Sequence, residues 1–425
     1  MDSILMVVRF SSVILFFYLL SLFAFAFTLP IDKLIGVNSV ALILLSATWL
    51  VDTSWRNKWQ NIRREPYIWG WIAYFLIVLV GLIYTEPKNL AWGVEILQRK
   101  LPLMALPLIL LSTNFLKNIW IDRLLKIFVW ALAGVAVFAL LRAFYAFQQE
   151  KDMNVFYNEK LASWVRMSGI YLAVMIGTAL LIVSEHILPT IFRRKEKFVW
   201  FLITFLLLIL LFMLNIRMAI GALLVVYIFI WINKFRWRGI AVAFGVILVA
   251  TIIITSNRTF YKKFYEAINM EERIIVGGKQ DHSLAKIWGG RAIRFAIWEC
   301  AWEVVEGNFW YGVGTGDVQT SLQQSYEENN FLFASRYNEF NAHNQFLETQ
   351  LSVGIIGFLL LLFNFIYLFI RGLRKGSLLI FAFTLYIFLN SLTESFLERQ
   401  KGITLYAFIA AILLLHQRNK AETAK

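Results

Sequence analysis

The chain has 425 residues, of which 60% are hydrophobic and only 16% are charged, and it contains 16 Trp, 16 Tyr and 38 Phe. A soluble enzyme of this composition would expose much of its apolar surface, so the composition excludes that class and indicates a polytopic membrane protein. Lys and Arg outnumber Asp and Glu by 41 to 27, which gives a net charge of +14. Such an excess is typical of cytoplasmic loops and of contact with anionic membrane lipid, and it disfavours nucleic acid as the partner.

Apolar runs of about 20 residues, the length that crosses a bilayer, recur along the chain with short polar breaks. We predict an all-α polytopic membrane protein with about twelve transmembrane helices, ten or eleven being the alternative. The predicted spans cover residues 10–29, 34–51, 67–84, 101–116, 124–147, 167–183, 198–214, 218–233, 239–255, 346–370, 377–392 and 403–416. The predicted domains are residues 1–255 with spans one to nine, a loop domain at 256–345, and residues 346–425 with the last three spans and a tail.

The distribution of Lys and Arg predicts the orientation of these spans. With twelve spans, the loops on the side of both termini carry 21 Lys and Arg residues, whereas the short loops of the other side carry 8. Positively charged loops stay in the cytoplasm. We therefore expect cytoplasmic termini, with the 256–345 loop on the outer side of the membrane.

The 256–345 loop contains too many aromatic residues for a disordered linker. Residues 283–307 have a helical spacing of three and four, which predicts an amphipathic helix at the membrane surface. Its predicted face carries Ile287, Arg291, Arg294, Phe295, Trp298 and Trp302. Of these we expect the aromatic residues to face lipid or protein and Arg291 to face a cavity. A Gly-rich turn at 311–317 and a polar helix at about 318–328 follow.

Cationic residues gather at the outer ends of the predicted spans. They are Arg99, Lys100, Arg142, Arg166 and Arg217, to which the loop adds Arg291, Arg294, Arg336 and His343. Guanidinium groups bind phosphate oxygens in a bidentate manner, so this set suits a phosphate or pyrophosphate head group. Arg217 stands in an almost loopless hairpin between two spans, where it either anchors the chain at the interface or binds an anion.

His343 lies in the segment Asn341-Ala-His343-Asn344-Gln345, immediately before an apolar helix. This position places an imidazole at the membrane surface facing the arginines, where it serves either as a general base or as a capping or interfacial polar group. Glu394 and Glu398, in the last outer loop, are either acceptor-sugar ligands or solvated residues. The single cysteine, Cys300, cannot form a disulfide within the chain, and no Cys/His spacing predicts a metal site.

One string of residues resembles a known family. His343-Asn344 is followed after nine residues by Gly354-Ile-Ile-Gly357, as in the His-Asn, nine-residue gap, Gly-x-x-Gly signature of the O-antigen ligase and O-antigen polymerase superfamily. Further similar features are the hairpin arginine Arg217, the Gly289-Gly290-Arg291 start of the loop helix, the Gly312–Gly316 turn and the Asn390–Ser395 segment. The resemblance is specific over residues 200–400 and is only a similar rhythm of spans over the first 150.

The resemblance implies a glycosyltransferase similar to the C type, which works at the periplasmic face of the bacterial inner membrane without metal, cofactor or nucleotide sugar. The family's ligases move a glycan from undecaprenyl diphosphate to the lipid A core, with inversion at the transferred sugar. By this resemblance Arg217 and Arg291 would hold the leaving diphosphate, and His343 would orient or deprotonate the acceptor hydroxyl. The remaining cations, with Asn344 and Glu394, are expected to bind diphosphate or glycan.

Two alternatives stay open at this point. A polymerase would join repeat units on the same carrier, but polymerases tend to have two Arg-bearing outer loops of comparable size, and the single dominant loop here favours a ligase. A polysaccharide transporter or flippase would need charged or Gly/Pro-broken helices near the membrane midplane and two related halves, which the sequence does not display. The glycan, the acceptor and the oligomeric state cannot be derived from the sequence.

Overall fold

The computed structural model describes residues 2–191, 193–236, 290–331 and 333–423. Within these residues every regular element is a helix and none is a strand. This confirms the predicted all-helical architecture. The predicted span at 239–255, and residues 256–289 of the predicted loop domain, lie outside the described residues.

The N-terminal half consists of apolar helices joined by short turns. Its α-helices are α1 (Asp2–Thr28), α2 (Ile35–Val51), α3 (Trp55–Arg64), α4 (Pro66–Val80), α5 (Leu90–Ser112), α6 (Asn118–Glu150), α7 (Asn158–Ser163), α8 (Gly169–Ile182), α9 (Arg194–Leu214) and α10 (Arg217–Phe235). Short 3-10 segments lie between them at η1 (Asp32–Leu34), η2 (Pro87–Asn89), η3 (Met153–Phe156) and η5 (Leu188–Thr190), and α8 continues into a π-helix, η4 (Val183–Ile187).

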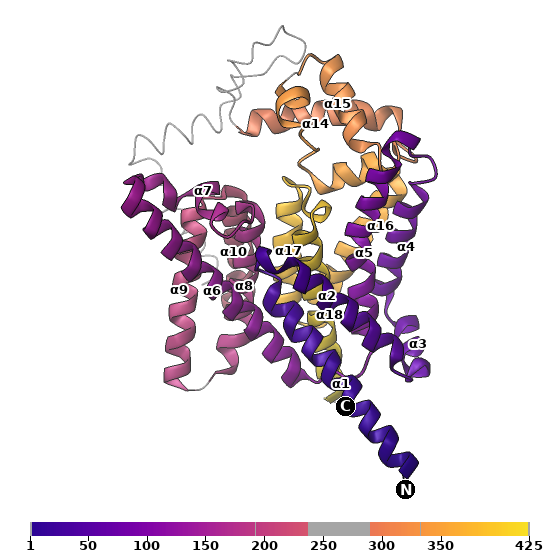
Figure 1. The fold of residues 1–425 in the computed structure, drawn as a ribbon, viewed down its shortest axis with the longest axis vertical. Coiled ribbons are helices and arrows are strands. Elements are labelled where there is room, and N and C mark those ends of the chain that lie inside the picture. Colours follow the sequence, from indigo (N-terminus) through magenta and orange to yellow (C-terminus); the bar gives the residue numbers. More distant parts are fainter. Residues whose placement is uncertain (1, 192, 237–289, 332, 424–425) are drawn as a thin grey trace.

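The C-terminal part begins with two helices that lie off the bundle and ends with three that belong to it. Its elements are α14 (Gly290–Gly307), α15 (Val318–Glu328), the π-helix η6 (Phe333–Asn338), α16 (Gln345–Arg374), α17 (Leu378–Ser391), the 3-10 segment η7 (Phe396–Glu398) and α18 (Gln400–Thr423). Figure 1 places α14 and α15 at one end of the bundle and both chain termini at the other. The assignment of these ends to the two sides of a membrane stays a prediction.

The interior of the bundle is built around α18. Residues 401–415 of this helix are all buried, and it packs against α5, α6, α8 and α17. The outer helices instead turn large apolar side chains outward, such as Ile43, Phe201 and Phe212, which are 65%, 63% and 65% exposed. Lipid tails are as apolar as these side chains, so close packing and interhelical hydrogen bonds must hold the helices together.

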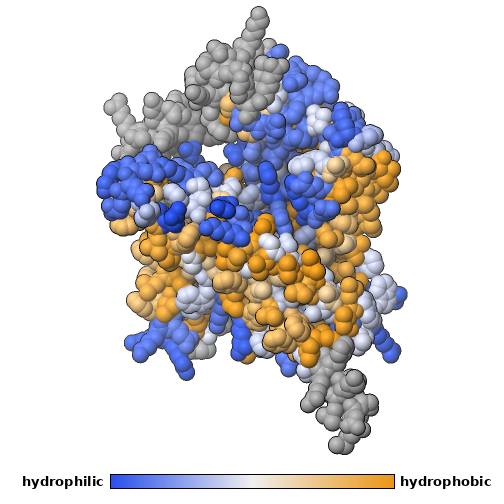
Figure 2. Space-filling model, viewed as in Figure 1, coloured by the Kyte–Doolittle hydropathy of each residue, from blue (hydrophilic) through white to orange (hydrophobic). Residues whose placement is uncertain are grey.

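Six helical segments are long and apolar enough to cross a membrane, among the residues that the structure describes. They are Asp32–Val51, Asn118–Glu150, Gly169–Thr190, Arg194–Leu214, Arg217–Phe235 and Gln345–Arg374, with shorter apolar helices at Ser12–Thr28, Pro66–Val80 and Leu378–Ser391. Figure 2 shows a hydrophobic band across the middle of the visible face, with hydrophilic residues at both ends. A polytopic membrane protein accounts for this pattern. Each predicted span outside 239–255 overlaps a helix, and the count of twelve stays a prediction.

Helices α14 and α15 pack on each other through the small and aliphatic residues of α14. Ile297, Cys300 and Ala301 are buried in a cluster that also contains Leu322 and Tyr326 of α15. On the predicted face, Phe295 and Trp302 remain 42% and 53% exposed, and Trp298 is half-buried with its indole N–H donating to Ala342 O at 3.0 Å. The spacing therefore located the helix, and the contact of its exposed aromatic residues with lipid stays a prediction.

Helix α16 is interrupted near its start, where Val353 (φ −137°, ψ 19°) and Gly354 (φ 66°, ψ −165°) leave the helical conformation. The interruption leaves backbone N–H and C=O groups of α16 without partners in the helix. Residues around the Gly-rich turn form hydrogen bonds with these groups. The bonds run from Val313 N to Leu351 O (2.7 Å), from Gly314 N to Ser352 O (3.1 Å) and from Ile355 N to Phe309 O (3.0 Å). The sequence did not predict this break.

The same turn is tied to the connection between α4 and α5. The Thr315 hydroxyl donates to Val78 O at 2.7 Å, and the carboxylate of Asp317 accepts from Glu86 N at 2.8 Å and from the Asn89 side-chain amide at 2.7 Å. The turn at 312–317 therefore joins α16 to the α4–α5 connection and fixes the α14–α15 pair on this end of the bundle.

Replacing Gly354 by Ala should destabilise the protein more than replacing Gly376 by Ala. Both glycines have positive φ, 66° and 62°, and such sparsely populated backbone conformations cost an L-residue about 1–3 kcal/mol. A Cβ at Gly354 would also lie 2.2 Å from Trp310 O, whereas a Cβ at Gly376 meets nothing within 4 Å. We expect thermal unfolding in detergent to give a clearly larger loss of melting temperature for Gly354→Ala. Equal losses would mean that the break does not depend on a close backbone approach.

Candidate functional site

The conformation of the chain around His343 is fixed on both sides. His343 has a left-handed backbone with φ 44°, and its backbone N–H donates to the Asn341 side chain at 3.2 Å. The Asn344 side-chain oxygen accepts from Phe346 N at 2.9 Å and Leu347 N at 3.1 Å and so caps the N-terminus of α16. The turn before α16 therefore holds the imidazole in place.

The His343 imidazole meets a carboxylate from the connection between α17 and α18. Its Nδ1 lies 3.2 Å from Glu394 Oε2, and the Glu394 side chain is only 13% exposed. A carboxylate only accepts hydrogen bonds, so Nδ1 carries the proton and Nε2 presents a lone pair. The ring is also in edge contact with Phe340, with centroids 5.5 Å apart. This arrangement suits an imidazole that accepts a proton at Nε2.

Arg294 of α14 approaches the same carboxylate. Its guanidinium lies 4.0 Å from Glu394 Oε2, and its Nε donates to Thr393 O at 3.2 Å. Glu394 therefore joins a histidine that precedes α16 to an arginine from α14. The Glu394 carboxylate is turned to His343 and Arg294, and its predicted contact with diphosphate or glycan stays a prediction.

Lys100 of α5 lies in a second, more buried group of charges. Its side chain is 3% exposed, and its ammonium lies 2.5 Å from Glu398 Oε1. The same carboxylate oxygen accepts from the Gln345 side-chain amide at 2.9 Å. Glu398 compensates the charge of Lys100, so this lysine joins α5 to the connection before α18. That Lys100 binds diphosphate or glycan stays a prediction.

Glu348 supports the segment around His343 from inside α16. It is buried, and its carboxylate accepts from Ala342 N at 3.0 Å and from the Ser395 hydroxyl at 3.3 Å. Sequence reasoning missed Gln345 and Glu348 as members of the site. The available signal was a pair of polar residues at the start of the predicted span, one immediately before it and one in its first turn.

Several of the other predicted cations have local partners. Arg99 pairs with Glu95, one turn away, and stacks over the Trp92 ring at 4.7 Å. Arg142 stacks over the Trp164 ring at 5.5 Å. Arg166, with φ 59°, follows α7 and is exposed. None of the hydrogen bonds or ion pairs between described side chains joins these three arginines to His343.

The predicted hairpin of Arg217 is confirmed. Helix α9 ends at Leu214, Asn215 takes a left-handed conformation with φ 53°, and α10 begins at Arg217. The Arg217 side chain is exposed, and neighbouring Ile216 lies beside the start of α8 at Gly169. Among described side chains, no hydrogen bond or ion pair joins Arg217 to His343.

The structure describes only the backbone positions of Arg291 and Arg336. Arg291 lies in the first turn of α14 and Arg336 in η6, and both side chains fall outside the described part of the structure. The predicted convergence of Arg217 and Arg291 in one pocket therefore stays a prediction. Helix α14 packs against α16, whose start follows His343, and η6 packs against α15; Figure 1 shows α14 and α15 at the same end of the bundle.

The single cysteine does not contribute a nucleophile. Cys300 lies inside the α14–α15 cluster, and burial, with a smaller contribution from the Glu303 carboxylate, raises the pKa of its thiol to about 12. At neutral pH the thiol stays protonated and unreactive. The chemistry available at this end of the bundle is therefore that of an oriented imidazole, carboxylates and guanidinium groups.

Replacing Glu398 by Gln should destabilise the protein, because it leaves the Lys100 ammonium buried without its carboxylate. Breaking a buried ion pair in this way costs about 3–5 kcal/mol. The double variant Lys100→Met/Glu398→Gln should recover most of the loss, since it leaves no uncompensated charge. The control is Glu86→Gln in the exposed pair with Lys88, where we expect at most about 1 kcal/mol. Thermal unfolding in detergent measures all three; a double variant as unstable as Glu398→Gln contradicts the interpretation.

Comparison with known proteins bears directly on this part of the chain. Residues 202–362 match the family model described as O-antigen ligase. The matched segment runs from α9 into α16 and contains the Arg217 hairpin, His343 and the Gly354–Gly357 pair. It confirms the resemblance to the O-antigen ligase and polymerase superfamily. No curated protein matches the chain.

Proposed function

We propose that this protein is an O-antigen ligase-type glycosyltransferase that moves a glycan from undecaprenyl diphosphate to the lipid A core. The observation that carries the proposal is the His343 imidazole, held by Glu394 beside the capped start of α16. The match of residues 202–362 to the O-antigen ligase family supports the reaction class. The excess of Lys and Arg in the loops on the side of the termini supports a multi-pass protein of the bacterial inner membrane whose active site faces the periplasm.

In the proposed reaction an acceptor hydroxyl attacks the anomeric carbon of the carrier-linked glycan. His343 Nε2 accepts the hydroxyl proton as the new glycosidic bond forms. The bond between the anomeric carbon and the diphosphate oxygen breaks, and the electron pair leaves with undecaprenyl diphosphate. Attack opposite the leaving group inverts the anomeric configuration. General base catalysis of this kind contributes about 10² to 10⁴ in rate.

Glu394 supports this step through the imidazole. Its carboxylate keeps the proton on Nδ1 and the lone pair on Nε2, and it stabilises the positive charge that forms on the ring when Nε2 accepts the proton. Arg294 in turn limits the positions that Glu394 can take, since it contacts the carboxylate from α14 and the Thr393 carbonyl beside it. Glu394 is thus a positioning residue in the proposed mechanism.

The reaction also requires that the departing diphosphate be stabilised. A departing diphosphate gains negative charge, which fixed guanidinium groups in a site with little water stabilise more strongly than water does. We assign this role to Arg217 and Arg291. The exposed position of Arg217 leaves its guanidinium available to a lipid-linked diphosphate at the membrane surface. Arg142, Arg166 and Arg336 are further candidates for contact with the glycan or diphosphate.

A polymerase that joins carrier-linked repeat units would use the same groups. The two functions differ in the acceptor, which is lipid A core for the ligase and a second carrier-linked glycan for the polymerase. In a deletion strain, loss of the glycan from lipid A together with accumulation of carrier-linked polymer supports the ligase. Accumulation of single repeat units on the carrier supports the polymerase, and unchanged glycan with normal lipid A contradicts both.

Replacing His343 by Ala should lower kcat by about 10² to 10⁴, because the acceptor hydroxyl loses its base, while KM for the carrier-linked donor should change little. Glu394→Gln should lower kcat by a smaller factor and alter the pH profile, because the amide no longer stabilises a protonated ring. The matched control is Glu328→Gln in the exposed part of α15, which should leave turnover unchanged. Turnover of purified protein in detergent measures these values.

The His343 result separates three roles. Weak donor binding with normal turnover at saturation would assign His343 to substrate binding and not to proton transfer. A variant that fails to fold, as judged by gel filtration in detergent, would assign it to the turn before α16. For Glu394→Gln, a normal pH profile together with reduced thermal stability would indicate a structural role only.

Replacing Arg217 by Lys should impair transfer markedly, because an ammonium group cannot reproduce the bidentate contact of a guanidinium with the diphosphate. Arg291→Lys should behave similarly. The control is Arg193→Lys, whose side chain is 85% exposed before α9 at the other end of that helix, and which should retain full activity. Full activity of the double variant Arg217→Lys/Arg291→Lys would remove both arginines from the mechanism.

A further inference from the structure

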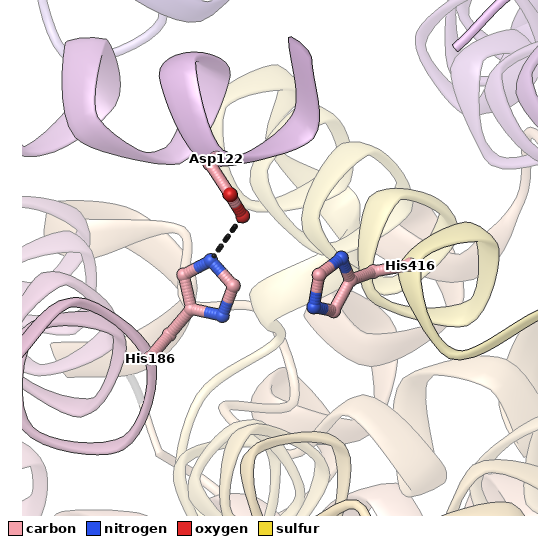
Figure 3. A group of neighbouring side chains, drawn as sticks. All are labelled: Asp122, His186 and His416. Atoms are coloured by element: carbon pink, nitrogen blue, oxygen red, sulfur yellow. Dashed lines mark hydrogen bonds and ion pairs between the residues drawn. The ribbon is translucent and has the colours of Figure 1, made fainter. Parts of the chain in front are cut away.

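A second group of titratable side chains lies far from His343 in the fold. Asp122 of α6, His186 of the π-helix η4 and His416 of α18 each turn one possible ligand atom toward the others, and these atoms lie within 4.8 Å of one another. Figure 3 shows the three side chains converging from separate helices. The group lies near the C-terminal end of α18, and the C-terminus is at the end of the bundle opposite α14 and α15 (Figure 1).

Two members of the group are joined by a hydrogen bond. His186 Nε2 lies 2.9 Å from Asp122 Oδ1. The His186 side chain is 10% exposed, whereas that of Asp122 is 42% exposed, so the carboxylate forms the open side of the group. The rings of His186 and His416 lie edge to face, with centroids 4.9 Å apart and an angle of 80° between their planes. The two rings therefore approach each other closely, with Asp122 beside His186.

His416 has the surroundings of a metal ligand. Its Nδ1 lies 3.1 Å from the side-chain oxygen of Asn118. An amide oxygen only accepts hydrogen bonds, so Nδ1 carries the proton and Nε2 keeps its lone pair. Nε2 is buried and has no hydrogen-bond partner in the described part of the chain. Metal-binding histidines typically donate their other ring N–H to an oxygen acceptor in this way, which fixes the tautomer and the ring orientation.

His186 lies in an irregular turn at the end of α8. The π-helix Val183–Ile187 follows α8 directly and is followed by the 3-10 turn Leu188–Thr190. Single π-turns within helices are rare and occur frequently at functional sites. Here the turn brings the His186 ring beside both Asp122 and His416, as Figure 3 shows. This placement is a second observation, independent of the lone pair on His416.

We propose that Asp122, His186 and His416 bind one first-row transition metal ion, with Zn²⁺ as the best fit. Two imidazole nitrogens and one carboxylate oxygen are ligands that Zn²⁺ takes, whereas Mg²⁺ and Ca²⁺ prefer oxygen ligands throughout. The exposed side of Asp122 gives the ion an entry path and leaves room for water as a fourth ligand. The ion joins α6 and α8 to the buried helix α18, and its role is therefore structural and separate from glycan transfer.

Metal binding by the purified, full-length protein tests the proposal. Protein in detergent is stripped with a chelator, equilibrated with buffered Zn²⁺ and analysed for bound metal. We expect about one ion per chain for the wild type, and loss of this ion in His186→Ala and His416→Ala. The matched control is His343→Ala, at the opposite end of the bundle, which should keep the ion. Asn118→Leu, which removes only the acceptor for His416 Nδ1, should weaken binding about 10- to 100-fold.

Two further measurements guard against variants that do not fold. Co²⁺ substituted into the wild type should give the visible absorption of a four-coordinate site, and Zn²⁺ should raise the melting temperature of the wild type but not of His416→Gln. Absence of stoichiometric binding to the wild type overturns the proposal and leaves a histidine–aspartate hydrogen bond alone. Binding that persists in the double variant His186→Gln/His416→Gln overturns it as well, because the ion then lies elsewhere.

Discussion

The break in α16 is the constraint on which the rest of this end of the molecule depends. A helix that leaves its regular conformation at Val353 and Gly354 exposes carbonyl and amide groups, and in or near hydrocarbon such groups must find partners within the protein. The residues around the Gly-rich turn supply these partners. Close approach of the two backbones requires glycine, since a Cβ at Gly312 would lie 2.5 Å from Leu351 O. The break thereby fixes α14 and α15, and it sets the position of His343 at the start of the same helix.

Two glutamates from the short connection between α17 and α18 contact several of the basic side chains at this end of the bundle. Glu398 compensates the buried ammonium of Lys100 and so joins α5 to this connection. Glu394 contacts both the His343 imidazole and the Arg294 guanidinium, so one carboxylate holds these two groups close to each other. Arg217, exposed at the start of α10, has the access that a substrate-binding cation needs. The connection thus separates structural charges from those assigned to the reaction.

Helix α18 links the two ends of the bundle. It begins directly after the connection that carries Glu394 and Glu398, and its last turns carry His416. Its buried middle packs against α5, α6, α8 and α17, so displacement of either end would disturb many contacts. A metal ion on Asp122, His186 and His416 would add a fixed attachment at the end remote from the proposed transfer reaction. The two proposals are independent, because neither uses a residue of the other.

The sequence by itself determined what depends on local pattern. Composition and runs of apolar residues specified an all-helical membrane protein, and the near absence of a loop between two spans placed Arg217 in a hairpin. The tertiary structure decided which helix faces meet. It packed the Ile297 side of α14 on α15, paired His343 with Glu394, and buried Lys100 against Glu398.

The candidate metal site lies at the limit of what a single sequence can specify. Asp122, His186 and His416 are separated by 64 positions or more, and none of them stands in a spacing that predicts a metal ligand. Their approach depends on the packing of three helices and on a π-turn that has no sequence signal of its own. Local periodicity fixes the existence of each helix, but the rotation and register of helices against one another arise from contacts between residues far apart in the chain. Those contacts alone brought the three side chains together.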